Sequence, residues 1–108
     1  MKSQQTIVVG LAGLVMLLVA PHAFAADAQI KIANFTFDPP TLTIKAGTTV
    51  TWVNGDDIPP VVAEKDGKFR SDALDTDDSF KQSFATAGTV EYFCAIHPHM
   101  TGKIIVTP

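Results

Sequence analysis

The sequence has little that could crosslink the chain or catalyse a reaction. It contains one cysteine in 108 residues, so no intramolecular disulfide can form. Lysine and arginine number 8 against 11 aspartate and glutamate, and this acidic balance argues against nucleic acid as a partner. No Ser-His-Asp arrangement, paired catalytic carboxylates or phosphate-binding glycine loop is present, so the sequence does not predict an enzyme.

Only one long hydrophobic run occurs, over residues 7–20, shortly after Lys2. The run is too short to span a bilayer comfortably, and the Ala-Phe-Ala stretch ending at Ala25 has the small-x-small pattern that signal peptidase cleaves. We therefore expect that residues 1–25 form a cleavable signal peptide. Residues 26–108 are expected to form a periplasmic or otherwise exported domain that is not stably inserted in a membrane. An uncleaved membrane anchor is the alternative.

The mature region alternates apolar and polar residues with period two, as at Ile30 and Ile32, and again at Val50 and Trp52. Turn residues separate these stretches at regular intervals, and residues 71–78 form a polar, acidic segment that we interpret as a loop. The pattern predicts an all-β domain of two facing sheets with about seven short strands and no helix. Its large core residues are expected to be Trp52, Phe35, Phe37, Phe80 and Phe84.

The segment YFCAIHPHM brings Cys94, His97 and Met100 to three-residue intervals. It is expected to connect a strand ending at Phe93 to one beginning near Gly102. A thiolate, an imidazole and a thioether form a soft donor set that suits copper better than structural zinc. Each residue alone also has a structural interpretation: a buried thiol, a surface histidine and a core methionine. An unpaired thiol in an exported protein could also form an intermolecular disulfide.

The segments TTVTWVNGDDIPPVV and EYFCAIHPHMTGKIIV together resemble the type 1 copper proteins, the cupredoxins, and within them the amicyanin and plastocyanin-like group. The resemblance covers residues 28–107 and implies a Greek-key β-sandwich. It also implies a monomer that carries single electrons to and from a transient redox partner protein. It implies a copper ion held by Cys94 as thiolate, His97 as exposed imidazole and Met100 as weak axial ligand. It also implies that Asn54 ties the upstream segment to the ligand loop.

In this family, the proline that matches Pro59 is followed by a histidine, the first copper ligand. This chain departs from the family because it has Pro60 at that position. Proline cannot coordinate a metal. His99 is a poor substitute because its side chain is expected to point outward, so water or an external ligand could complete the site. Pro60 also lacks a backbone N–H, which predicts that the strand at Val61 and Val62 lies at a sheet edge or begins one residue later.

Three functions are compatible with these features. The first is an exported electron carrier with an incomplete or altered copper site, docking through the apolar residues Ala95, Ile96 and Pro98. The second is a copper carrier or delivery module that holds Cu(I) without redox cycling, which the missing histidine favours. The third is a metal-free, degenerate sandwich that acts in protein interaction. The acidic residues of the 71–78 segment are interpreted as a solvated loop, with a docking patch as the alternative.

Overall fold

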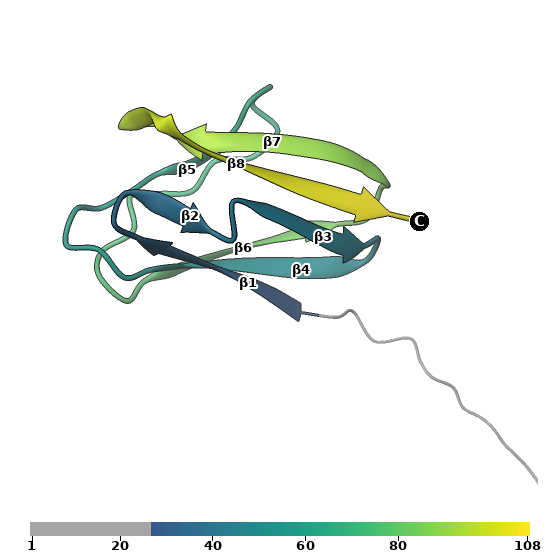
Figure 1. Ribbon diagram of the computed structural model, residues 1–108, viewed down its shortest axis with the longest axis horizontal. Helices are drawn as coiled ribbons and strands as arrows, with labels where there is room; N and C mark the ends of the chain where they lie inside the picture. The colour runs from purple at the N-terminus through teal and green to yellow at the C-terminus, as the bar shows by residue number, and fades with distance from the viewer. Residues whose placement is uncertain (1–26) are drawn as a thin grey trace, which may run out of the picture.

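The computed structural model describes residues 27–108, which form eight strands and no helix (Figure 1). The predicted all-β sandwich is confirmed, with eight strands rather than seven. The expected signal peptide and its cleavage after Ala25 lie outside the described residues. Within the described part of the chain, no helix is long and apolar enough to cross a membrane.

The strands form two four-stranded sheets. The first has the order β2-β1-β4-β6, with strands β2 (Thr36–Asp38), β1 (Asp27–Ala33), β4 (Thr48–Asn54) and β6 (Ser79–Phe84). The second has the order β3-β8-β7-β5, with strands β3 (Thr41–Lys45), β8 (His97–Thr107), β7 (Gly88–Cys94) and β5 (Val62–Glu64).

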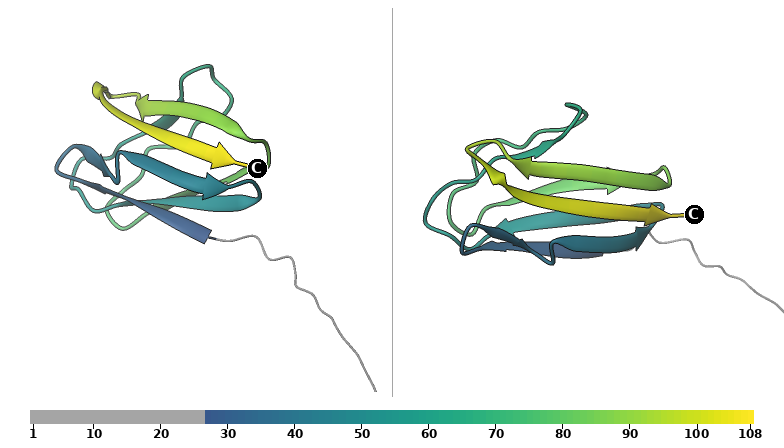
Figure 2. Two further views of the ribbon diagram at one scale, coloured as in Figure 1. Left: turned by 45° about the vertical axis from the view of Figure 1, so that its right-hand side comes forward. Right: turned by 45° about the horizontal axis from the view of Figure 1, so that its top comes forward.

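Strands distant in sequence pair within each sheet. β1 runs parallel to β4, and β3 runs parallel to β8, whereas the other neighbours are antiparallel. The turn between β1 and β2 and the turn between β7 and β8 come to the same end of the sandwich, opposite the C-terminus (Figure 2). This end carries the candidate site.

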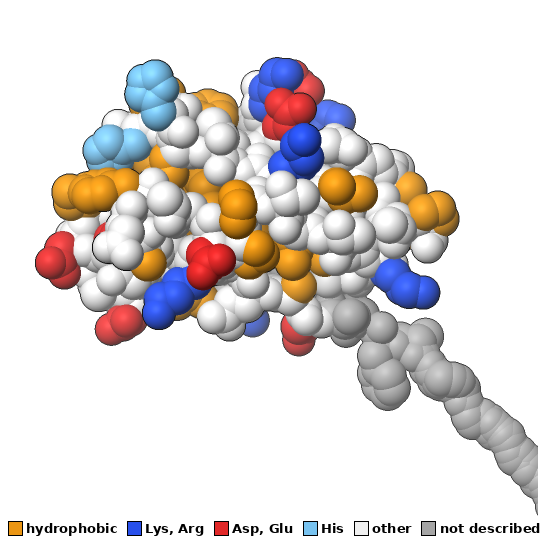
Figure 3. Space-filling view, in the orientation of Figure 1, with side chains coloured by type: hydrophobic (Ala, Val, Ile, Leu, Met, Phe, Trp, Pro, Cys, Tyr) orange, Lys and Arg blue, Asp and Glu red, His pale blue; other side chains and the backbone are white. Residues whose placement is uncertain are grey.

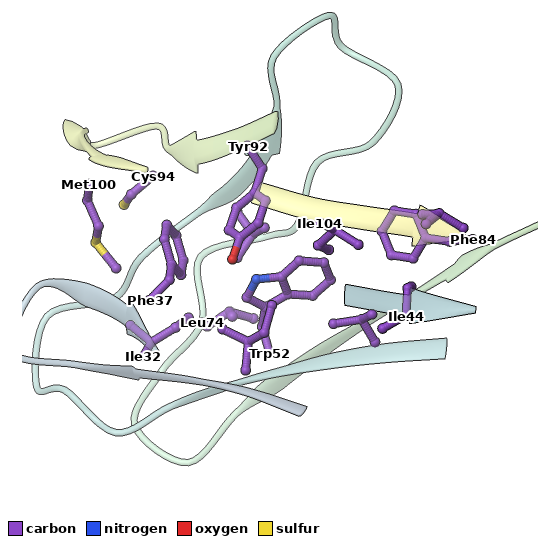
Figure 4. Packing of buried hydrophobic residues seen from close by; sticks show 14 residues of the cluster. Ile32, Phe37, Ile44, Trp52, Leu74, Phe84, Tyr92, Cys94, Met100 and Ile104 are labelled. Atoms are coloured by element: carbon purple, nitrogen blue, oxygen red, sulfur yellow. The ribbon is translucent and has the colours of Figure 1, made fainter. Parts of the chain in front are cut away.

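Trp52 occupies the centre of the core and is fully buried (Figure 4). Its ring lies 5.2 Å from that of Tyr92 and 5.7 Å from that of Phe80, measured between centroids. Alternating residues of β4 point into this core, as the period-two pattern predicted. Phe37 and Phe84 are buried and Phe80 is partly buried, in agreement with the predicted core.

Phe35 is the exception among the predicted core residues. Its side chain is 51% exposed, so the expectation that it fills the core is wrong. The residue occupies the tight turn between β1 and β2 rather than a strand, and the alternation that buries Ile32 does not continue through the turn. Period two resumes at Phe37, which is buried.

Gly102 lets the Tyr92 ring lie across β8. The two residues are cross-strand partners, and a Cβ added to Gly102 would clash with the Tyr92 ring. Because Tyr92 is buried, its ring cannot move away without disturbing the core.

Gly102→Ala is therefore expected to lower the free energy of unfolding by about 1–3 kcal/mol, the usual cost of overpacking a core. Urea unfolding followed by tryptophan fluorescence measures this loss. A matched substitution at Gly55, where an added Cβ would meet the Ile32 carbonyl oxygen at 3.1 Å and the Lys31 side chain at 3.3 Å, should cost less. Equal unfolding midpoints for wild type and Gly102→Ala would contradict the close packing of Tyr92 on Gly102.

Candidate metal centre

The β7–β8 hairpin holds all three predicted donors, but in a different way from the one expected. β7 continues through Cys94, and β8 begins at His97, so the two residues pair across a two-residue turn. The register shifts between Phe93, which pairs with Thr101, and Cys94, so β8 carries three additional residues in a bulge. The predicted loop between Phe93 and a strand start near Gly102 is therefore wrong; the donors lie at strand ends and in the bulge.

Cys94 and Met100 contribute their sulfur atoms to the inside of the sandwich. Cys94 is a free thiol with no exposed surface, and Met100 is 7% exposed. Both side chains extend from the hairpin towards the same side, next to Phe37 (Figure 4). A bulge that returns Met100 to the inner face thus places a thioether and a thiol at one end of the core.

His97 and His99 are exposed, unlike the two sulfur residues. These two histidines, the only ones in the described chain, project at one end of the molecule beside hydrophobic side chains (Figure 3). The exposed position of His99 agrees with the expectation that its side chain points outward. The His97 ring packs edge-on against Phe35, with ring centroids 5.3 Å apart and an interplanar angle of 69°.

Pro60 lies beside this hairpin and is buried. The amide of Ala95 donates to the carbonyl oxygen of Val61 over 2.9 Å, and Val62 pairs with Cys94. β5 begins at Val62 and forms the edge of its sheet, so the prediction for the strand after Pro60 is confirmed in both its alternatives. The structure therefore brings position 60 next to the Cys94 turn, where proline has no side-chain donor atom.

Asn54 is fully buried, and its hydrogen bonds differ from those that the resemblance implied. Its amide group donates to the carbonyl oxygens of Asp56 at 3.1 Å and Leu74 at 2.9 Å, and its side-chain oxygen accepts from the Asp56 amide at 2.9 Å. Within the described chain, none of its side-chain hydrogen bonds reaches the 94–100 hairpin. Asn54 instead fixes the turn after β4 against the 71–78 segment, which is a loop as predicted.

Tyr92 and Trp52 each bury a polar atom in the core of the sandwich. Neither the Tyr92 hydroxyl oxygen nor the Trp52 Nε1 has a hydrogen-bond partner of normal geometry among the described residues. Burial raises the pKa of Tyr92 to about 12, and the nearby Trp52 N–H offsets part of this effect. The phenol is therefore neutral at physiological pH and contributes no charge near Cys94.

The donor set decides which metal these residues fit. No group of three or more His, Cys, Asp and Glu side chains that could hold a metal ion occurs within residues 27–108. Cys94 and His97 supply a thiol and an imidazole at the hairpin, and Met100 adds a thioether. Two sulfur donors and one nitrogen suit Cu(I), which accepts soft ligands, better than Mg²⁺ or Ca²⁺, which prefer oxygen.

The sequence did not lead us to expect Phe35 beside His97. A signal was available, because Asn34 precedes Phe35 between two apolar stretches, and asparagine is frequent in two-residue hairpin turns. The aromatic residue after it concealed the turn, since glycine is the usual residue there.

Comparison with known proteins supports these observations. Residues 7–106 match the family model for the cupredoxin-like domain. The chain is 42% identical over 94 residues to the amicyanin of Paracoccus versutus, covering 82% of this chain and 71% of the relative. It is 37% identical over 103 residues to the chloroplastic plastocyanin of Tetradesmus obliquus, again covering 82% and 71% of the two chains. A solved purple cupredoxin from Nitrosopumilus maritimus superposes with a TM-score of 0.69 at 35% identity, covering 74% of this chain and 99% of that one.

Proposed function

The chain belongs to the cupredoxin-like family, and from this premise we propose that it is a copper-binding single-electron carrier whose copper site lacks one histidine. The observation that carries the proposal is the placement of two buried sulfur atoms, from Cys94 and Met100, at the end of the sandwich where His97 is exposed. An oxidisable thiol is thereby kept from solvent while an imidazole reaches the surface.

Cys94, His97 and Met100 would hold the copper ion, which supplies a one-electron couple between Cu(I) and Cu(II) when bound. Cys94 provides the strongest donor as a thiolate, Met100 a weak thioether, and His97 an imidazole. Pro60 provides none at the place of the fourth ligand. Because Cu(II) prefers additional nitrogen or oxygen donors, the missing imidazole penalises the oxidised ion more and raises the reduction potential.

His97 is the exit for the electron, and the surface around it is where a redox partner docks. Ile96 is 48% exposed, Phe35 is 51% exposed, and Pro98 is also exposed. A small apolar surface around a charge-transfer residue suits the weak, short-lived complexes that redox partners form. No substrate is turned over in this role, so the protein is not an enzyme.

A second candidate function rests on Pro60 alone. A site with two sulfur donors and one imidazole holds Cu(I) without needing Cu(II), so the protein could deliver copper rather than carry electrons. In both cases we propose that residues 1–25 direct export and that residues 26–108 act as a monomer.

Measuring the affinities for both copper ions on the purified 26–108 domain tests the proposal. Competition with a Cu(I) chelator should reveal tight Cu(I) binding in both cases. An electron carrier should also bind Cu(II) stoichiometrically and show a visible thiolate-to-copper absorption band, whereas a delivery module should refuse Cu(II). Absence of binding for both ions, with Cys94 titrating as a plain thiol in the presence of copper, would contradict both functions.

A further inference from the structure

The turn between β1 and β2 has an unusual composition for its conformation. Ala33 pairs with Thr36, so Asn34 and Phe35 form a two-residue loop, and their φ angles are 54° and 59°. A loop with positive φ at both positions favours Asn-Gly, because glycine has no Cβ to clash. Phenylalanine in the left-handed region is strained, and such residues persist when the surroundings hold them in place.

Asp56 holds this turn in its strained form. One carboxylate oxygen accepts from the Asn34 amide at 2.8 Å, and the other accepts from the Phe35 amide at 3.0 Å. The backbone of Asp56 is itself fixed by the buried Asn54 side chain and by the Thr76 hydroxyl, which donates to its carbonyl oxygen at 2.9 Å. A buried amide thus anchors an aspartate that secures both strained residues.

Burial of the Phe35 side chain does little to offset this strain. Its ring is 51% exposed, and it meets the His97 ring edge-on with the centroids 5.3 Å apart. It also borders a surface cavity of about 320 Å³, lined by Phe35, Ile96, His97, Pro98, His99 and Met100. The ring is therefore presented to the donor hairpin rather than to the core.

We propose that Phe35 is a positioning residue that fixes the orientation of the His97 imidazole, and that Asp56 holds Phe35 in place for this purpose. The consequence for copper rests on the proposed function, in which His97 is a donor. The orientation itself does not, because it rests only on the contact between the Phe35 and His97 rings.

The first test uses the metal-free 26–108 domain and the Phe35→Gly and Phe35→Tyr variants. In wild type, nuclear Overhauser cross-peaks should join the Phe35 and His97 rings, and the His97 ring protons should be shifted by the neighbouring ring current. Phe35→Gly should move these His97 resonances to random-coil positions, and Phe35→Tyr should restore the wild-type shift. Because glycine relieves the left-handed strain, Phe35→Gly should also raise Tm by about 4 °C.

Two matched controls separate an effect on the orientation of the His97 ring from an effect on the stability of the domain. Asp77 also has a positive φ, 71°, and does not border the cavity beside His97, so Asp77→Gly should raise Tm without moving the His97 resonances. Asp56→Asn should weaken the contact between the rings, whereas Asp57→Asn should not, because the Asp57 carboxylate is exposed and accepts no hydrogen bond within the described chain. If Asp56→Asn fails to fold, the Phe35 variants still decide the question.

Copper affinity provides the second readout. Phe35→Gly should lower the Cu(I) affinity about tenfold, and Phe35→Tyr should restore it. A tenfold loss is at the lower end of the effects seen when a residue that orients a metal ligand is removed. Unchanged His97 resonances in Phe35→Gly would overturn the positioning role, and a lower Tm for that variant would contradict the strain argued for Phe35. The resonances of the metal-free protein decide that role even if the wild type binds no copper, in which case only the proposed function fails.

Discussion

Replacing Pro60 by histidine is expected to increase Cu(II) affinity far more than Cu(I) affinity. Position 60 lies beside the Cys94 turn, because Ala95 donates to Val61 over 2.9 Å. An imidazole there would supply the nitrogen donor that Cu(II) prefers, and its gain should exceed the roughly 10–100-fold that outer partners of ligands contribute. Each tenfold gain in Cu(II) affinity relative to Cu(I) affinity lowers the reduction potential by about 59 mV. Voltammetry measures this shift.

Two neighbouring substitutions control this experiment. Pro59 is exposed, so Pro59→His adds an imidazole one residue away, outside the site, and should leave the potential unchanged. Pro60→Ala removes the ring without adding a donor and separates the effect of volume from that of coordination. If Pro60→His bound Cu(II) no better than Pro59→His, position 60 would not be the place of the missing ligand.

Removing the thiol through Cys94→Ser is expected to cause the largest loss of copper binding. Structural zinc sites in small domains are worth at least about 10 kcal/mol, and on that scale the strongest of three donors contributes at least an equal share, about 3 kcal/mol. This corresponds to a loss of more than about a hundredfold in Cu(I) affinity. Competition with a Cu(I) chelator measures the loss, and any thiolate-to-copper absorption should disappear.

Met100→Leu is the matched control, because it keeps a buried apolar side chain of similar volume and removes only the thioether. Its loss of Cu(I) affinity should be smaller than that of Cys94→Ser, since a thioether is the weaker donor. Equal Cu(I) affinities for wild type and Cys94→Ser would show that copper, if bound, is held elsewhere.

The strands that were easiest to predict are those whose inner residues alternate without interruption. Val50 and Trp52 are buried at alternate positions of β4, and Ile104 and Val106 are buried in β8. The polar, acidic composition of residues 71–78 predicted their loop conformation, which the structure shows. Local periodicity does not specify partners, however, so the parallel pairings of β1 with β4 and of β3 with β8 could not be predicted from it.

The errors have a common physical origin in tight turns. The aromatic side chain of Phe35 favours a core position, but two hydrogen bonds to Asp56 hold the residue in a turn that asparagine and glycine usually form. The sequence predicts a loop for Cys94 and His97, but a register shift lets both strands continue to a two-residue turn. In the first case the contact comes from Asp56, more than twenty residues away, and in the second Cys94 also pairs with Val62 of β5.

Cu K-edge X-ray absorption on the Cu(I)-loaded 26–108 domain is the most direct test of the copper site. The proposed donors predict two sulfur scatterers, from Cys94 and Met100, and one imidazole, from His97, with the sulfur signal reduced in Cys94→Ser. Two imidazoles in the first coordination shell, or copper without a sulfur neighbour, would contradict the account.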